Sequence, residues 1–166
     1  MENLWSPWRS KYIESFNSVS DKSICIFCMM TGLNPIDKDN LIVDKGVHTF
    51  TVLNLYPYNN GHLMVVPFRH TNDFCSLSSK EYTEVVQKLQ LAEKALRIVL
   101  KPQGFNIGAN IGKAAGAGID EHLHFHIVPR WNGDTNFMPV IGNVKVISQD
   151  LLETKEKLLA AYLELS

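Results

Sequence analysis

The chain has 166 residues, and it lacks long apolar runs and a large surplus of either charge. It contains only three cysteines. No apolar run approaches the roughly 18 residues of a membrane span, so we expect no membrane partner. The formal net charge of -1 lacks the basic surplus of a large nucleic-acid interface, so nucleic acid is not an expected partner. The N-terminal segment has no apolar signal core, which favours a cytoplasmic location.

The three cysteines are Cys25, Cys28 and Cys75. An odd number in a chain expected in the cytoplasm favours thiols or metal ligands over a disulfide framework. The Cys25-x-x-Cys28 pair is compatible with a redox pair, half of a zinc site, or two thiols in an apolar cluster. The redox interpretation requires a thioredoxin-like βαβ context, which the neighbouring sequence lacks. Cys75 has no visible partner and is predicted to be an ordinary buried thiol.

Hydrophobic patterning predicts an α+β fold with an antiparallel sheet of about five strands, one long helix and a C-terminal helix. The expected strands occupy residues 40–46, 47–54, 61–68, 105–110 and 122–131, and 144–148 can add a short one. Hairpin-like strands followed by a helix and more strands favour this class over alternating parallel units. We treat residues 1–166 as a single domain with an aromatic arm at 1–21 and a C-terminal helix at 149–164.

The long helix has clear start and stop signals. Ser78 and Glu81 form a capping box, and Pro102 and Gly104 end the helical pattern. Apolar residues at a spacing of three or four predict one buried face. They are Tyr82, Val85, Val86, Leu89, Ala92, Leu96, Val99 and Leu100.

Three of the six histidines alternate along one predicted strand, at His122, His124 and His126. Alternate side chains of a strand share a face, so the three imidazoles are expected on one face and the apolar residues between them on the other. One interpretation is a polar outer face. A second is a catalytic metal held by all three imidazoles. In a third, one imidazole is a nucleophile that its neighbours orient.

A glycine-rich segment with Gly112, Gly116 and Gly118 precedes the histidines. Such a loop can turn several backbone N–H groups toward one point and bind an anion, or it can be a plain flexible hairpin loop. It is not a P-loop, because the Ser or Thr after Lys113 and the required glycine spacing are missing. An anion site beside imidazoles suggests phosphate chemistry.

The heptad from His122 to Val128 resembles the signature of the histidine triad family of nucleotide hydrolases and transferases. The cysteine pair, Gly61-His62, the segment 67–70 and Asn110 are similar to family landmarks and follow the family order. The resemblance covers roughly residues 22–137. The segments "LWSPWRSKYI" and "VPRWNGDTNFMPVI" resemble the branch that includes dinucleoside tetraphosphate phosphorylases.

This resemblance implies a HIT-like fold, a homodimer and a phosphorylase or hydrolase of a dinucleoside polyphosphate such as diadenosine tetraphosphate. It assigns catalytic roles to His124, which would form a nucleotidyl-histidine, to His126, which would bind phosphate oxygens, and to His62. His62 can equally be a satisfied core histidine. The implied nucleotide-binding set is Asn54, Asn110, Gly116, Gly118 and His126.

The family resemblance also implies a structural zinc site. Zinc-bearing members use the histidine that closes the strand 61–68 and the first triad histidine. The implied ligands here are Cys25, Cys28, His70 and His122. The second triad histidine would then stay free to attack phosphorus.

One segment departs from the family pattern. Many members place Gly-Gln-Ser or Gly-Gln-Thr before the triad, whereas this chain has Ala117-Gly118-Ile119 and no hydroxyl. The choice between phosphorylase and hydrolase is therefore open. Alternatives are an adenosine monophosphoramidase-type hydrolase and a non-catalytic nucleotide-binding module. Ile42 and Phe50 are candidate base contacts.

The aromatic and basic residues outside the core motif have two interpretations. Trp5, Trp8 and Trp131 can pack the arm onto the domain, or they can wall the substrate or a subunit interface. Arg9 and Arg130 can meet distal phosphates, because the planar guanidinium suits them.

Overall fold

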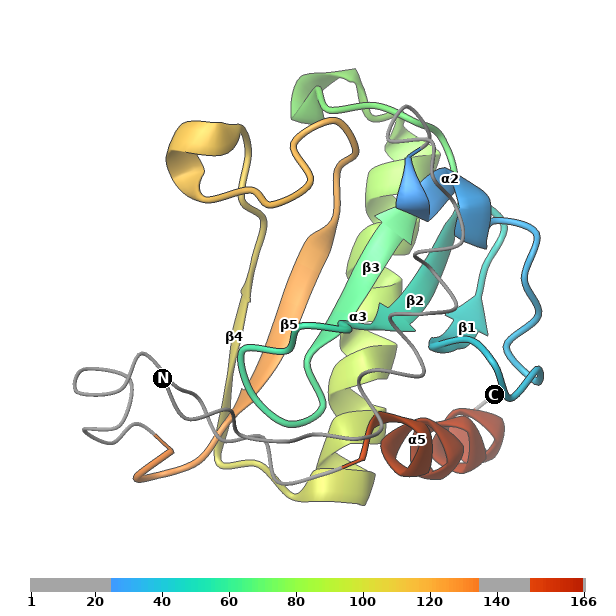
Figure 1. The fold of residues 1–166 in the computed structure, drawn as a ribbon, viewed down its shortest axis with the longest axis vertical. Coiled ribbons are helices and arrows are strands. Elements are labelled where there is room, and N and C mark those ends of the chain that lie inside the picture. Colours follow the sequence, from blue (N-terminus) through green and yellow to red (C-terminus); the bar gives the residue numbers. More distant parts are fainter. Residues whose placement is uncertain (1–24, 135–149, 166) are drawn as a thin grey trace, which may run out of the picture.

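The computed structural model describes residues 25–134 and 150–165. Its five strands form one antiparallel sheet in the order β1-β2-β3-β5-β4 (Figure 1). The elements are α2 (Ile26–Met30), β1 (Ile42–Lys45), β2 (Thr49–Leu53), β3 (Leu63–Pro67), the 3-10 turn η1 (Phe74–Ser76), α3 (Ser79–Leu100), β4 (Gly104–Gly108), the 3-10 turn η2 (Lys113–Ala115), β5 (Phe125–Arg130) and α5 (Leu151–Leu165). The predicted α+β class and antiparallel sheet are confirmed.

α3 covers one face of the sheet and contacts β2, β3 and β5. In Figure 1, α3 lies behind the sheet. The short helix α2 lies at the end of the sheet where β2 begins and β3 ends. α5 contacts α3 and β1. Every residue of β2 and β3 is buried, and both strands lie inside the sheet rather than at its edge. No helix in the described part of the chain is long and apolar enough to cross a membrane.

The predicted capping box opens α3. The Ser78 hydroxyl accepts from the Glu81 backbone N–H at 3.3 Å, and Glu81 Oε2 accepts from the Ser78 N–H at 2.8 Å. The helix ends at Lys101, whose φ of 49° is left-handed. These contacts satisfy backbone groups that a helix end otherwise leaves unpaired.

The predicted buried face of α3 is partly wrong. Val85, Leu89 and Leu96 are buried, whereas Tyr82 and Val86 are each 52% exposed. Each residue of a helix is rotated by about 100° from the one before, so a stripe centred on positions 85 and 89 turns 82 and 86 outward. Both residues lie at the edge of the apolar stripe, and the sequence spacing alone does not show which edge faces the core.

The buried carboxylate of Glu81 is expected to contribute more stability than an exposed one on the same helix. The Arg69 guanidinium, at 2.8 Å, lowers the pKa of Glu81 from 4.5 to about 2, with help from the Ser78 hydrogen bonds. A lowered pKa in the folded state stabilises the protein above the unfolded pKa, and this contribution is lost as the pH falls from about 4.5 toward 2. We expect Glu81→Gln to lower the free energy of unfolding by about 1–2 kcal/mol at pH 7, measured with urea.

Glu93→Gln is the matched control for this prediction. Glu93 pairs with Arg97 one turn away on the exposed side of α3, and such pairs contribute less than about 0.5 kcal/mol. The difference between wild type and Glu81→Gln should shrink as the pH falls below about 4. An equal loss in the two variants, or a difference that does not depend on pH, would contradict the prediction.

The expectation of a continuous strand from His122 is wrong. β5 begins at Phe125, which pairs with Val65, so His122 and His124 precede the strand. Continued pairing would place Pro67 opposite Leu123, and proline has no N–H to give to the ladder. The Leu123 N–H instead donates to the Thr71 carbonyl at 2.7 Å. The chain therefore joins the sheet only at Phe125, and His122 contacts the Pro67 carbonyl and Cys25 Sγ instead of a strand neighbour.

Several sequence predictions fall outside the described residues. They are the aromatic arm at 1–21 with Trp5, Trp8 and Arg9, and the short strand at 144–148. The predicted C-terminal helix at 149–164 is observed as α5, Leu151–Leu165.

Candidate active site and metal centre

The two cysteines of the Cys-x-x-Cys pair converge with two distant histidines. Cys25 caps α2 and Cys28 lies within it, while His70 follows β3 and His122 precedes β5. One ligand atom from each of the four residues lies within 4.8 Å of the other three. In the described part of the chain this is the one group of three or more His, Cys, Asp or Glu that could hold a metal ion, and neither His124 nor His126 belongs to it.

The distances within this cluster fit a tetrahedral zinc ion. Cys25 Sγ lies 3.3 Å from His122 Nδ1, and Cys28 Sγ lies 3.3 Å from His70 Nδ1 and 3.7 Å from His122 Nδ1. Zinc bonds of about 2.3 Å to sulfur and 2.0–2.1 Å to nitrogen place S and N ligands about 3.6 Å apart at a tetrahedral angle. A closed set of two thiolates and two imidazoles is the chemistry of a structural zinc site.

The surroundings of the cluster support metal binding in two further ways. His122 Nε2 donates to the Pro67 carbonyl at 2.8 Å, which leaves Nδ1 unprotonated and directed at the thiols. Burial and the adjacent Cys25 raise the pKa of the Cys28 thiol, so a bound cation would favour the thiolate form of Cys28. The third cysteine is different: Cys75 is exposed, and the prediction that it is buried is wrong, because η1 lies on the surface.

The imidazole of His124 is oriented by the main chain of the preceding histidine. Its Nδ1 lies 2.9 Å from the His122 carbonyl oxygen, which can only accept, so Nδ1 carries the proton. Nε2 then holds a lone pair. Burial lowers the pKa of His124 and keeps the ring neutral, and the Phe27 ring packs 5.1 Å from it. A neutral imidazole with a free Nε2 lone pair is a nucleophile.

His126 carries its proton on Nε2, whereas His124 carries it on Nδ1. A hydrogen bond from the Tyr58 backbone amide, acting through His62, determines this. The Tyr58 N–H donates to His62 Nδ1 at 3.0 Å, so a neutral His62 carries its proton on Nε2. That proton is donated to His126 Nδ1 at 2.9 Å. The proton of His126 therefore lies on Nε2, which has no hydrogen-bond partner in the described part of the chain. We call the path Tyr58 N–H, His62, His126 the histidine relay.

Burial also keeps His126 neutral. Burial is the larger cause and the neighbouring His124 the smaller one, and together they lower the pKa of His126 to about 4. The rings of His124 and His126 are 4.8 Å apart and nearly perpendicular. The site thus presents one nitrogen lone pair and one N–H donor side by side at neutral pH. All three triad histidines are buried, which excludes the interpretation as a polar outer face.

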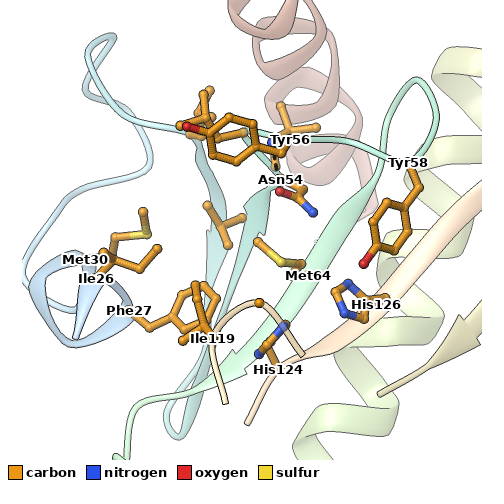
Figure 2. A pocket seen from close by; sticks show the side chains of 15 residues that line it. Ile26, Phe27, Met30, Asn54, Tyr56, Tyr58, Met64, Ile119, His124 and His126 are labelled. Carbon is orange, nitrogen blue, oxygen red and sulfur yellow. Dashed lines mark hydrogen bonds between the residues drawn. The ribbon is translucent and has the colours of Figure 1, made fainter. Parts of the chain in front are cut away.

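His124 and His126 line an apolar cavity of about 440 Å³ (Figure 2). α2 and the centre of the sheet supply most of its wall, and the loop after β2 adds polar and aromatic groups. The lining residues are Ile26, Phe27, Met30, Leu41, Val52, Leu53, Asn54, Leu55, Tyr56, Tyr58, Met64, Gly118, Ile119, His124 and His126. A cavity of this size with a few convergent polar groups suits one nucleoside.

The predicted nucleotide-binding residues divide into two groups. Asn54, Gly118 and His126 line the cavity, whereas Asn110 and Gly116 do not. The Gly116 N–H donates to the Lys113 carbonyl at 2.9 Å, which stabilises the loop itself. Ile119, which follows Gly118, directs an apolar side chain at the cavity (Figure 2).

Three other sequence expectations differ from the structure. Ile42 and Phe50, the candidate base contacts, are fully buried in the core and do not line the cavity. Arg130 forms a two-pronged ion pair with Asp134 and donates to Asn106, so its guanidinium is engaged within the protein. Bidentate pairing holds an arginine in one geometry, which explains why it is not directed at the cavity.

The sequence did not indicate most of the cavity wall. The sequence predictions assigned no role to Tyr56, Tyr58, Met30 or Met64, which all line the cavity. The Tyr58 ring packs 4.6 Å from His62 and 5.7 Å from His126, so it covers the histidine relay. The two tyrosines around Pro57 are the one signal that could have suggested a binding loop.

Comparison with known proteins agrees with this geometry. The family model for the HIT domain matches residues 36–133. The AP-4-A phosphorylase of Mycobacterium tuberculosis is 40% identical over 163 residues, which covers 95% of this chain and 83% of the relative. The bis(5'-adenosyl)-triphosphatase of Saccharomyces cerevisiae is 32% identical over 88 residues, covering 52% of this chain and 42% of the relative.

A solved structure extends the likeness to the fold. A Zn-bound histidine triad family protein from Mycobacterium smegmatis superposes with a TM-score of 0.67 at 27% identity, and the match covers 85% of this chain and 94% of that one. The sequence match and the structural superposition agree with each other. The chain belongs to the HIT domain family.

Proposed function

We propose that this protein is a dinucleoside polyphosphate phosphorylase that acts on diadenosine tetraphosphate through a nucleotidyl intermediate on His124. The observation that carries the proposal is the pair of neighbouring nitrogens with opposite roles. His124 Nε2 offers a lone pair and His126 Nε2 offers a proton, and both face a cavity of nucleoside size. The similarity to an AP-4-A phosphorylase supports the choice of substrate.

The reaction begins with attack on phosphorus. One adenosine occupies the cavity, with its base against the apolar wall and its ribose near Asn54, which places the α-phosphorus at the histidines. His124 Nε2 forms a bond to this phosphorus, and the bond to the bridging oxygen breaks. His126 Nε2–H stabilises the charge that develops on the phosphoryl oxygens. Adenosine triphosphate leaves, and an adenylyl group remains on His124.

Inorganic phosphate completes the reaction. One of its oxygens attacks the adenylyl phosphorus, the bond to His124 Nε2 breaks, and adenosine diphosphate leaves. The free imidazole regains its lone pair. The loop before the triad, with Gly118 at the cavity, would direct backbone N–H groups at the incoming phosphate.

Product analysis tests the proposal directly. Purified protein is incubated with diadenosine tetraphosphate, with and without inorganic phosphate, and the nucleotides are separated by anion exchange. We expect adenosine diphosphate and adenosine triphosphate, formed only when phosphate is present. Adenosine monophosphate and triphosphate without phosphate would make the protein a hydrolase. No turnover by folded protein would refute the dinucleotide proposal and favour phosphoramidates or a binding role.

We further propose that zinc occupies the cluster of Cys25, Cys28, His70 and His122 as a structural ion. When bound, zinc ties α2 to the segments that follow β3 and precede β5. The distances within the cluster support this assignment, and so does the Zn-bound histidine triad neighbour.

The free state of all three cysteines supports a cytoplasmic location, where thiols stay reduced.

A homodimer is the oligomeric state that we propose. Among residues 25–134 and 150–165, β4 is an edge strand that pairs with β5 alone, and Ile107 on it is 52% exposed. An exposed edge strand with an apolar side chain can pair with the same strand of a second copy around a two-fold axis. Sedimentation equilibrium measures the mass in solution, and a monomer would refute this part of the proposal.

Loss of the histidine relay is expected to slow turnover without abolishing it. His62→Phe fills a similar volume but gives no proton to His126 Nδ1, so the tautomer of His126 is no longer fixed. We expect kcat to fall about 100-fold, the usual contribution of a positioned proton donor. Steady-state kinetics with diadenosine tetraphosphate measures it. His62→Gln restores an N–H donor and should recover part of the loss. Equal activity in the two variants would contradict the role of the relay.

A further inference from the structure

The apolar wall of the cavity depends on a segment without regular structure. α2 ends at Met30 and β1 begins at Ile42, and residues 31–41 connect them through turns. Met30 lies just before this connection and Leu41 lies at its end, and both side chains line the cavity. A shift of the connection would therefore move both residues and change the width of the nucleoside pocket.

A buried lysine of α5 holds the second half of this connection. Lys155 is 2% exposed, and its ammonium donates to the Asp37 carbonyl at 2.5 Å, the Asn40 carbonyl at 2.9 Å and Asn40 Oδ1 at 3.2 Å. An ammonium has three N–H donors, and these three oxygens match them. Burying a lysine ammonium costs free energy unless its donors are satisfied. The three oxygens therefore have to stay in place around Lys155.

Asn40 transmits this contact to the cavity wall. Its side chain is 3% exposed, Nδ2 donates to the Asn34 carbonyl at 2.8 Å, and Oδ1 accepts from the Ile42 N–H at 2.9 Å. Leu41 lies between the two residues that this network fixes. The position of the Leu41 side chain is therefore set by contacts that begin on α5.

A second lysine holds the first half of the connection. Lys45 of β1 donates from Nζ to the carbonyls of Thr31 and Leu33, at 2.5 and 3.0 Å. Thr31 directly follows Met30. The two ammonium groups thus hold the connection near Met30 and near Leu41, from different elements of the fold.

We propose that Lys155 is a positioning residue for the nucleoside pocket, which makes α5 part of the binding machinery although no residue of α5 lines the cavity. This inference rests on the proposed function, because it takes a nucleoside as the occupant. Lys155 touches no substrate and acts through Asn40 and Leu41. It should affect the binding of the nucleoside and leave the chemistry at His124 unchanged.

Lys155→Met tests the inference, because methionine keeps most of the length and loses all three donors. We expect the Kd for adenosine monophosphate, measured by calorimetry, and the KM for diadenosine tetraphosphate to rise about tenfold. The kcat should stay within about twofold, because the relay and the His124 tautomer are unchanged. Lys157→Met is the matched control, because Lys157 is exposed on the same helix and pairs only with Glu153 among the described residues.

The possible outcomes separate a positioning role from a structural one. A fall in thermal stability with unchanged Kd and KM would overturn the inference, and so would a fall in kcat at constant KM. If Lys155→Met fails to fold, Lys45→Met tests the other end of the connection and should give the same selective rise in Kd; an unchanged Kd in that folded variant would overturn the inference. Wild-type protein that binds adenosine monophosphate but turns over no dinucleotide would refute only the proposed function.

Discussion

A His124→Ala variant is expected to fold, to bind adenosine monophosphate and to lose at least about 10⁴-fold in turnover of diadenosine tetraphosphate. Alanine removes the imidazole nitrogen whose lone pair is directed at the cavity. The remaining groups can still bind the nucleoside and the phosphates, so affinity should change little. Wild-type protein quenched in the absence of phosphate should carry an added adenylyl mass, and the variant should not.

His48→Ala is the control for this experiment. His48 directly precedes β2 and does not line the cavity, so its replacement removes a histidine without changing the site. Activity within about twofold of wild type is expected. Substantial turnover by His124→Ala, or an adenylyl group found on another residue, would show that a different group attacks phosphorus.

The second large effect is expected on stability. Cys28→Ser should abolish stoichiometric zinc, measured by elemental mass spectrometry, and lower the free energy of unfolding by several kcal/mol. A structural metal binds only the folded state, so its binding energy adds to folding. Cobalt should bind the wild-type cluster and give the visible absorption of thiolate ligation, and the variant should lose it.

Cys75→Ser is the matched control, because Cys75 is exposed and lies outside the cluster. It should keep full zinc content and stability. Equal zinc content in the two variants would mean that the metal is held elsewhere. Zinc bound with no effect on unfolding would mean that the ion is not structural.

The two ends of α3 were predicted correctly from local sequence signals. The Ser78–Glu81 capping box and the stop after Leu100 depend on neighbouring residues, and both are observed. The convergence of Cys25, Cys28, His70 and His122 followed from family resemblance, and the geometry agrees with it. The zinc ion itself and the catalytic roles remain predictions.

The errors have long-range causes. β5 begins late because Pro67 lies opposite Leu123 and because Thr71 offers a different acceptor, which depends on how β3 pairs with β5. The cavity wall combines Met30, Leu41 and Met64 from separate elements. The histidine relay joins residues 64 positions apart. No periodicity in the sequence reports such contacts.

The contact between the Tyr58 amide and His62 has a consequence for how this site can vary. The position of a proton at the reacting phosphate is determined by a peptide group, and every residue except proline carries that group. Substitutions at position 58 can therefore change how the ring covers the imidazoles while the proton stays in place. Related enzymes could differ freely there in the nucleotides they accept, and proline is the one replacement that would cost them the relay.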